Sequence, residues 1–87
     1  MWSKDKIIEI FSDTMKALTG IDFENNSELK REKLLGEKIN LKARDLLLLL
    51  DNVEKSFSVS IPEKSICDGL FDTYDHILEL LFQLLVY

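Results

Sequence analysis

The chain has 87 residues, 46% of them hydrophobic and 31% charged, with three glycines and one proline. This composition excludes a disordered segment and favours one helical domain spanning residues 1–87 over a β fold, which needs many turns. The net charge of −5 argues against nucleic-acid binding, the longest apolar run of five leucines is too short for a membrane span, and the single Cys67 suits the cytoplasm.

The first predicted helix begins after Ser3 and ends at Gly20. The Ser3 hydroxyl can accept a hydrogen bond from a free amide of the first turn, and glycine favours the left-handed conformation that ends many helices. Apolar residues recur inside this segment at helical spacing. They define a buried stripe of Ile7, Phe11, Met15 and Leu18.

A long connection is predicted from residue 21 to residue 41. Within it, Ser27 is expected to cap a short helix from Glu28 to Leu35, which Gly36 stops. A connection of this length is rarely featureless inside a compact domain, so its apolar side chains are expected to pack on the core. These side chains are Phe23, Leu29, Leu34, Leu35, Ile39 and Leu41.

The second long helix is predicted from Ala43 to Phe57. At 100° per residue, Leu47 lies on a flank of its core-facing arc and Leu48 points away from the core. A single exposed leucine is common, but on this helix we interpret Leu48 as a candidate contact for a partner. The core-facing arc consists of Leu46, Leu50, Val53 and Phe57, with Leu49 at its edge.

The C-terminal part is predicted to contain a short helical turn and a final helix. Residues 58–62 form an extended link, because the residue before Pro62 is held out of the helical region. A helical turn near residues 63–67 is broken at Gly69, and the last helix begins near Asp72-Thr73. One of its apolar stripes, Ile77, Leu80, Leu81 and Leu84, suffices for a three-helix core. The second, Tyr74, Leu78, Phe82 and Leu85, is surplus and indicates a wide burial face, a partner surface or a homodimer through Leu78, Phe82 and Leu85.

The order of these elements, together with Val53, Glu54, Phe57 and Ile61-Pro62, resembles the acyl and peptidyl carrier proteins. The resemblance implies an all-α fold, a small acyl-carrier-protein-like four-helix bundle with a long first loop. Carriers bear phosphopantetheine on a serine, and counting back from Phe57 and Pro62 places that serine at Ala43. The usual Asp-Ser-Leu of carriers is Lys42-Ala43-Arg44 in this chain, and a second register starting from Gly36 falls on residues 37–39. Neither register supplies a hydroxyl, so no phosphopantetheine or other cofactor is expected.

Degenerate carrier-like proteins of this kind occur beside bacterial peptide-maturation enzymes, including those for bacteriocin-like products. The chain resembles that acyl carrier-related class, which implies a non-catalytic protein-interaction module and not an enzyme. The implied partner is a peptide-modifying enzyme or a precursor peptide. The expected contact surface consists of Lys42, Ala43, Arg44, Leu47, Leu48 and Asp51.

Two other functions stay open at this point. A genuine carrier in fatty-acid, polyketide or peptide biosynthesis would have to attach its arm elsewhere, at Ser27, Ser56, Ser58 or Ser60. A helical dimerisation module would use the second stripe of the last helix. An acyl chain held between the helices, against Leu46, Leu49 and Leu50, is a further idea, but ordinary core packing is the favoured interpretation.

Residues of the metal-ligating types lie close together only around His76. They are Cys67, Asp68, Asp72, Asp75 and His76, and they lack the spacing of known metal sites. We therefore expect no metal centre, and we interpret Asp72 and His76, four residues apart on one helix face, as a capping carboxylate and a surface imidazole.

Overall fold

The computed structural model describes residues 2–67, 69 and 71–86 of the chain. Over these residues it contains four α-helices, two short 3₁₀ helices and no β-strand, so the all-α prediction is confirmed for the described part. The elements are α1 (Lys4–Thr19), η1 (Phe23–Asn25), η2 (Ser27–Arg31), α2 (Ala43–Phe57), α3 (Glu63–Cys67) and α4 (Tyr74–Leu85). None of the helices in these ranges is long and apolar enough to cross a bilayer.

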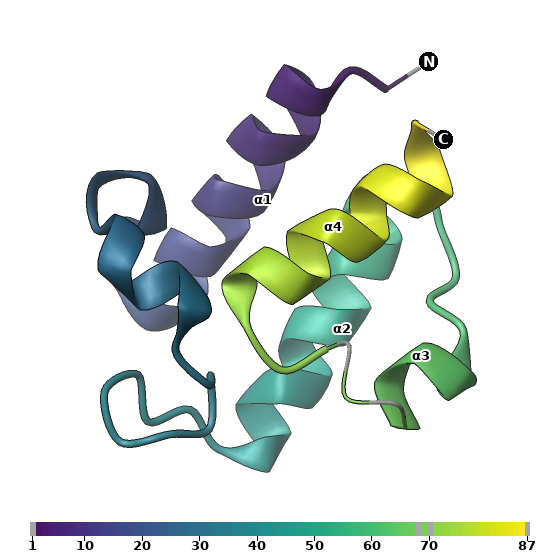
Figure 1. The fold of residues 1–87 in the computed structure, drawn as a ribbon. Coiled ribbons are helices and arrows are strands. Elements are labelled where there is room, and N and C mark those ends of the chain that lie inside the picture. The colour runs from purple at the N-terminus through teal and green to yellow at the C-terminus, as the bar shows by residue number, and fades with distance from the viewer. Residues whose placement is uncertain (1, 68, 70, 87) are drawn as a thin grey trace.

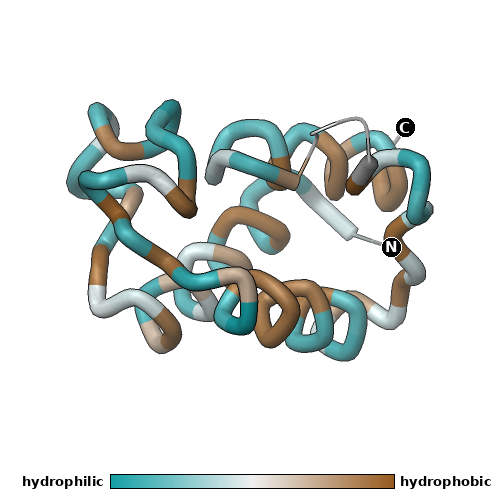
Figure 2. Tube along the Cα trace, turned by 90° about the horizontal axis from the view of Figure 1, so that it is seen from below, coloured by the Kyte–Doolittle hydropathy of each residue, from teal (hydrophilic) through white to brown (hydrophobic). Residues whose placement is uncertain are grey.

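Three long helices surround the core. Helix α1 packs against both α2 and α4, and η2 contacts α4 (Figure 1). The start of α1 and the end of α4 lie at the same end of the bundle (Figure 1), and hydrophobic and hydrophilic stretches alternate along the coloured trace (Figure 2). The side chains that are fully buried at the centre come from all three long helices and from the first loop. They include Ile7, Phe11, Met15, Phe23, Leu34, Leu49, Val53, Tyr74, Ile77 and Leu81.

Local signals in the sequence set the helix ends as predicted. Ser3 Oγ accepts a hydrogen bond from Lys6 N–H at 3.2 Å, and Gly20 closes α1 with a left-handed φ of 77°. At α4, Thr73 Oγ1 accepts from His76 N–H at 3.1 Å. Because each cap satisfies a backbone group that the helix leaves free, it fixes where the helix begins or ends. The bounds predicted for α2 and α3 are confirmed as well.

The short helix predicted from Glu28 to Leu35 is wrong. Ser27 lies inside η2 instead of capping it, and the backbone is already extended at Glu32, with φ −79° and ψ 143°. The reason is a pairing with the segment before α4: Lys33 forms an antiparallel bridge with Thr73, and Leu34 N–H donates to the Asp72 carbonyl at 2.8 Å. This tertiary pairing replaces the helical hydrogen bonds that the local sequence would otherwise favour.

The buried side chain of Tyr74 contacts the N-terminal part of the same loop. Tyr74 Oη donates a hydrogen bond to Glu24 Oε2 at 2.7 Å, and Glu24 also lies 3.2 Å from Lys30 Nζ. The Tyr74 ring stacks on Phe23, with centroids 4.7 Å apart and planes 14° apart. Burial and the hydrogen bond to the Glu24 carboxylate raise the pKa of Tyr74 far above its usual value, so the phenol stays protonated as the donor.

The buried face of α2 differs from the predicted arc. Leu49, Val53 and Phe57 are buried, whereas Leu46 and Leu50 are only partly covered. At 100° per residue, this moves the centre of the buried face by about 30° toward Leu49. The correction matters for function because it turns Leu47 further toward solvent.

Both apolar stripes of α4 are used inside this chain. Tyr74 and Leu78 of the second stripe are buried, and Phe82 and Leu85 pack partly covered against the core. In the first stripe, Leu84 is 38% exposed. A homodimer through the second stripe stays a prediction, but most of the surplus apolar surface that motivated it is covered within the chain.

Candidate functional site

The residues expected to contact a partner lie at the start of α2 and along its exposed side. Lys42 occupies the cap position with an extended backbone, and its N–H donates to Asp45 Oδ2 at 3.1 Å. This hydrogen bond sets the first helical residue at Ala43, whose side chain is exposed. The position expected for the carrier serine is therefore a methyl group at the solvent-facing beginning of the helix.

Four of the expected contact residues form one line along the helix. Arg44, Leu47, Leu48 and Asp51 follow the spacing i, i+3, i+4 and i+7, which places them on a single face, here called the α2 stripe. All four are exposed, and Leu47, at 67%, is more exposed than Leu48, at 49%. The sequence had placed Leu47 only on a flank. The shifted buried face of α2 accounts for the difference.

Charged residues lie at both ends of the α2 stripe, before and after Leu47 and Leu48. At its far end, Asp51 pairs with Lys55 over 3.0 Å. At its near end, Arg44 in the first turn and Lys42 at the cap position are exposed cations. Cations there oppose the helix macrodipole, which typically costs about 0.3–1 kcal/mol for each exposed charge. An anion from outside the chain would relieve this repulsion.

An apolar hollow of about 230 Å³ adjoins the first turns of α2. We call it the α2–α3 hollow. Its apolar walls come from three separate segments of the chain, and the Lys33–Asp72 ion pair lies at its rim. The sequence analysis did not find it, because only the fold brings these segments together. The walls are Leu35, Leu46, Ile66 and Phe71, with Gly69 between the last two.

A polar cluster holds the loop wall of this hollow in place. The Asp72 carboxylate accepts from Lys33 Nζ and lies 2.5 Å from His76 Nδ1. Partial burial opposes ionisation of Asp72, but the hydrogen bonds from Lys33 and His76 outweigh it and hold the pKa of this carboxyl below its usual value. The Asp72–His76 pair expected from the sequence is thus present, although the capping oxygen is that of Thr73.

The remaining residues of the metal-ligating types around His76 are Cys67, Asp68 and Asp75. Over the described residues no group of three or more His, Cys, Asp or Glu side chains is placed to hold an ion. Asp68 and the side chain of Cys67 lie outside what the structure describes.

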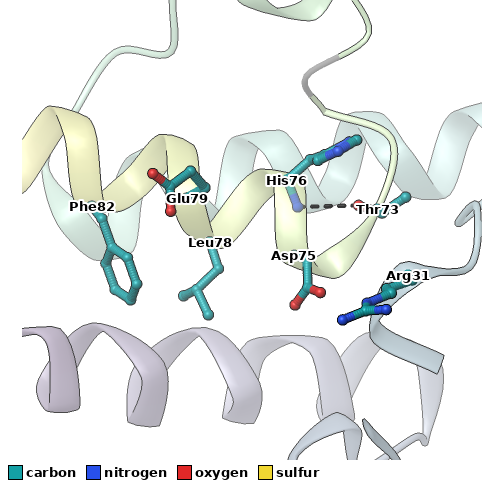
Figure 3. Close-up of a pocket in the computed structure, with 7 residues that line it drawn as sticks. All are labelled: Arg31, Thr73, Asp75, His76, Leu78, Glu79 and Phe82. Atoms are coloured by element: carbon teal, nitrogen blue, oxygen red, sulfur yellow. Dashed lines mark hydrogen bonds between the residues drawn. The ribbon is translucent and has the colours of Figure 1, made fainter. Parts of the chain in front are cut away.

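A second, larger hollow of about 620 Å³ lies along α4 (Figure 3). Asp75, Glu79 and Phe82 of α4 line it, together with Arg31 of η2, whose guanidinium lies toward the Asp75 carboxylate. The one hydrogen bond drawn there is the cap between Thr73 and His76 N–H (Figure 3). None of the six residues expected to contact a partner on α2 lines this hollow, whereas Leu78 and Phe82 of the predicted homodimer stripe do. Its mixed charges suit neither an anion nor a cation well.

The serines offered as alternative attachment points lie away from the start of α2. Ser56 is exposed but sits near the C-terminal end of the helix, about 20 Å from Ala43 at a rise of about 1.5 Å per residue. Ser58 and Ser60 follow the helix, and Ser27 lies in η2. Two of the leucines suggested to surround an acyl chain are in different places. Leu46 lines the α2–α3 hollow, whereas Leu49 is fully buried in the core.

Comparison of the chain with protein-family models, with curated proteins and with solved structures gave no match. The resemblance to carrier proteins therefore rests on the residues quoted for it, and the function rests on the geometry of α2.

Proposed function

We propose that this chain is a non-catalytic protein-interaction module, an acyl carrier-related protein without phosphopantetheine. It docks on its partner through the start and the exposed side of α2, much as a carrier docks on an enzyme, but it delivers no thioester. Under this proposal it acts in a cytoplasmic peptide-maturation system of the bacteriocin type, as the resemblance implies, and its partner is a peptide-modifying enzyme or a precursor peptide.

The observation that carries this proposal is the pair of adjacent exposed leucines on the α2 stripe. Leu47 is 67% exposed and Leu48 is 49% exposed, on a helix whose other face is well buried. Burying one fully exposed leucine side chain contributes about 1.5–3 kcal/mol, so a partner that covers the exposed parts of both gains about 2–3.5 kcal/mol, compared with roughly 8 kcal/mol for a micromolar Kd.

The experiment measures binding of purified products of the neighbouring genes to the intact chain, for example by biolayer interferometry. The test variant is the double substitution Arg44→Glu, Leu48→Asp. Its matched control is Lys16→Glu, Leu84→Asp, which places the same chemical changes at exposed positions of α1 and α4. Circular dichroism establishes that both variants are helical.

We expect the test variant to bind at least about tenfold more weakly than the control variant, because it loses an apolar contact and reverses a charge at the interface. Undiminished binding by the test variant would rule out this surface.

A further inference from the structure

The basic side chains of this chain are concentrated in one segment. Residues 30–44 hold six of the eleven lysines and arginines and only two acids, a net charge of +4. The rest of the chain has a net charge of −9. The end of the molecule that carries the proposed docking surface therefore differs in sign from the remainder.

Part of this positive charge is neutralised inside the chain, and part is not. Three lysines of the loop already pair with acids, whereas Lys42 and Arg44 are exposed and make no ion pair with the described residues. Lys42 and Arg44 therefore stand unpaired at the start of α2. The sixth basic residue, Arg31 of η2, also makes no ion pair with the described residues, but its guanidinium lies toward the Asp75 carboxylate in the hollow along α4 (Figure 3). The neutralised ones are Lys30 with Glu24, Lys33 with Asp72 and Lys38 with Glu32.

Each of the two cations at the start of α2 lies beside an apolar surface. Lys42 precedes Leu46 by four residues, so it is one turn away on the same face, and Leu46 lines the α2–α3 hollow. Arg44 precedes Leu47 by three residues on the α2 stripe. Leu35, which also lines the hollow, is itself 52% exposed. Cationic and apolar groups therefore lie together around the first turns of α2, on two sides of the helix.

Resting on the proposed function, we propose that the partner contributes an acidic amphipathic segment. Its carboxylates pair with Lys42 and Arg44, one leucine-like side chain enters the α2–α3 hollow, and another covers Leu47. The hollow is large enough, since apolar cavities of roughly 150 Å³ already accept a benzene-sized molecule. This is the helix-in-groove mode of peptide recognition, with charge setting its specificity.

A polyanion without apolar groups fits this surface poorly. A nucleic acid would leave the hollow and Leu47 uncovered, and its extended charge would face the net −9 of the remaining residues. The combination of carboxylates and leucines in one segment is therefore the chemistry that the surface selects.

The test uses the full chain and a short fluorescein-labelled peptide of alternating glutamate pairs and leucine pairs, followed by fluorescence anisotropy. Three comparison probes isolate the chemistry: a peptide with lysine in place of glutamate, a peptide with alanine in place of leucine, and a labelled single-stranded oligonucleotide. Three variants locate the site. Lys42→Glu, Arg44→Glu reverses the cations, Leu35→Ala removes a wall of the hollow, and Lys16→Glu, Leu84→Ala is the matched control.

We expect the glutamate–leucine peptide to bind at least about tenfold more tightly than each comparison probe. Reversing the two cations should weaken it by about tenfold, Leu35→Ala by about threefold, and the control by less than about twofold. Equal binding of the lysine peptide or of the oligonucleotide would overturn the proposal. So would a homodimer in sedimentation experiments that dissociates on reversal of Lys42 and Arg44, because a second copy would then be the occupant.

The two proposals fail in different ways. If the glutamate–leucine peptide does not bind but a natural partner binds and is lost in the Arg44→Glu, Leu48→Asp variant, the docking surface stands and the acidic character of the partner is wrong. If no neighbouring gene product distinguishes that variant from its control, the docking surface itself is wrong.

Discussion

Replacing Tyr74 by phenylalanine tests whether one hydrogen bond holds the first loop on the bundle. The substitution keeps the stacking on Phe23 and removes only the hydroxyl that donates to Glu24 at 2.7 Å. Hydrogen bonds to charged groups contribute about 1.5–3 kcal/mol. Here the side chain of Glu24 stays 37% exposed and keeps Lys30, so no unpaired buried charge remains. We therefore expect a loss of about 1–2 kcal/mol in the free energy of unfolding.

Urea denaturation followed by circular dichroism measures this loss. In a domain of this size each kcal/mol lowers Tm by roughly 4–8 °C, so a thermal scan should show a fall of about 5–10 °C. A double-mutant cycle with Glu24→Gln isolates the pair, and we expect a coupling energy of about 1 kcal/mol between the two positions. A Tyr74→Phe variant within about 0.5 kcal/mol of the wild type, or a cycle with no coupling, would refute the reasoning.

Further predictions concern the two faces of α2 and the polar cluster. Leu49→Ala should cost about 2–5 kcal/mol in urea denaturation, and Leu47→Ala less than about 0.5, because Leu49 is fully buried and Leu47 is 67% exposed. Similar losses of unfolding free energy in the two variants would contradict the observed burial. Folding lowers the pKa of Asp72. The stability that its ionised carboxylate contributes to the fold is therefore complete above about pH 5. It is lost as the pH falls first through the pKa of the unfolded chain, about 4, and then through the lower pKa of the folded chain. Wild type should therefore lose more stability than Asp72→Asn between pH 7 and pH 3, and parallel curves would contradict this.

Local chemistry explains which parts of the fold were predicted from the sequence. Ser3, Gly20 and Thr73 satisfy or close helix ends through groups within a few residues, so their effect can be read from the sequence. Leu46 to Leu50 show the limit of this method. Five consecutive leucines contain no polar residue to mark the solvent side, and the buried face was misplaced by about 30°.

The first loop and the hollow depend on contacts between distant segments. The Tyr74–Glu24 hydrogen bond joins residues 50 positions apart, and the Lys33–Asp72 ion pair joins residues 39 positions apart. No local pattern encodes such pairs. The exposed residues of the α2 stripe were foreseen because they lie on one helix, whereas the α2–α3 hollow required the chain to fold.

Intact mass after incubation with coenzyme A and a promiscuous phosphopantetheinyl transferase tests most directly whether this chain binds or carries. We expect the wild type to keep its mass, and the variant Lys42→Asp, Ala43→Ser, Arg44→Leu, which restores Asp-Ser-Leu at the start of α2, to gain one phosphopantetheine. A gain of mass by the wild type would show that the protein is a carrier. An unmodified triple variant would contradict the carrier-like arrangement that places the attachment position at Ala43.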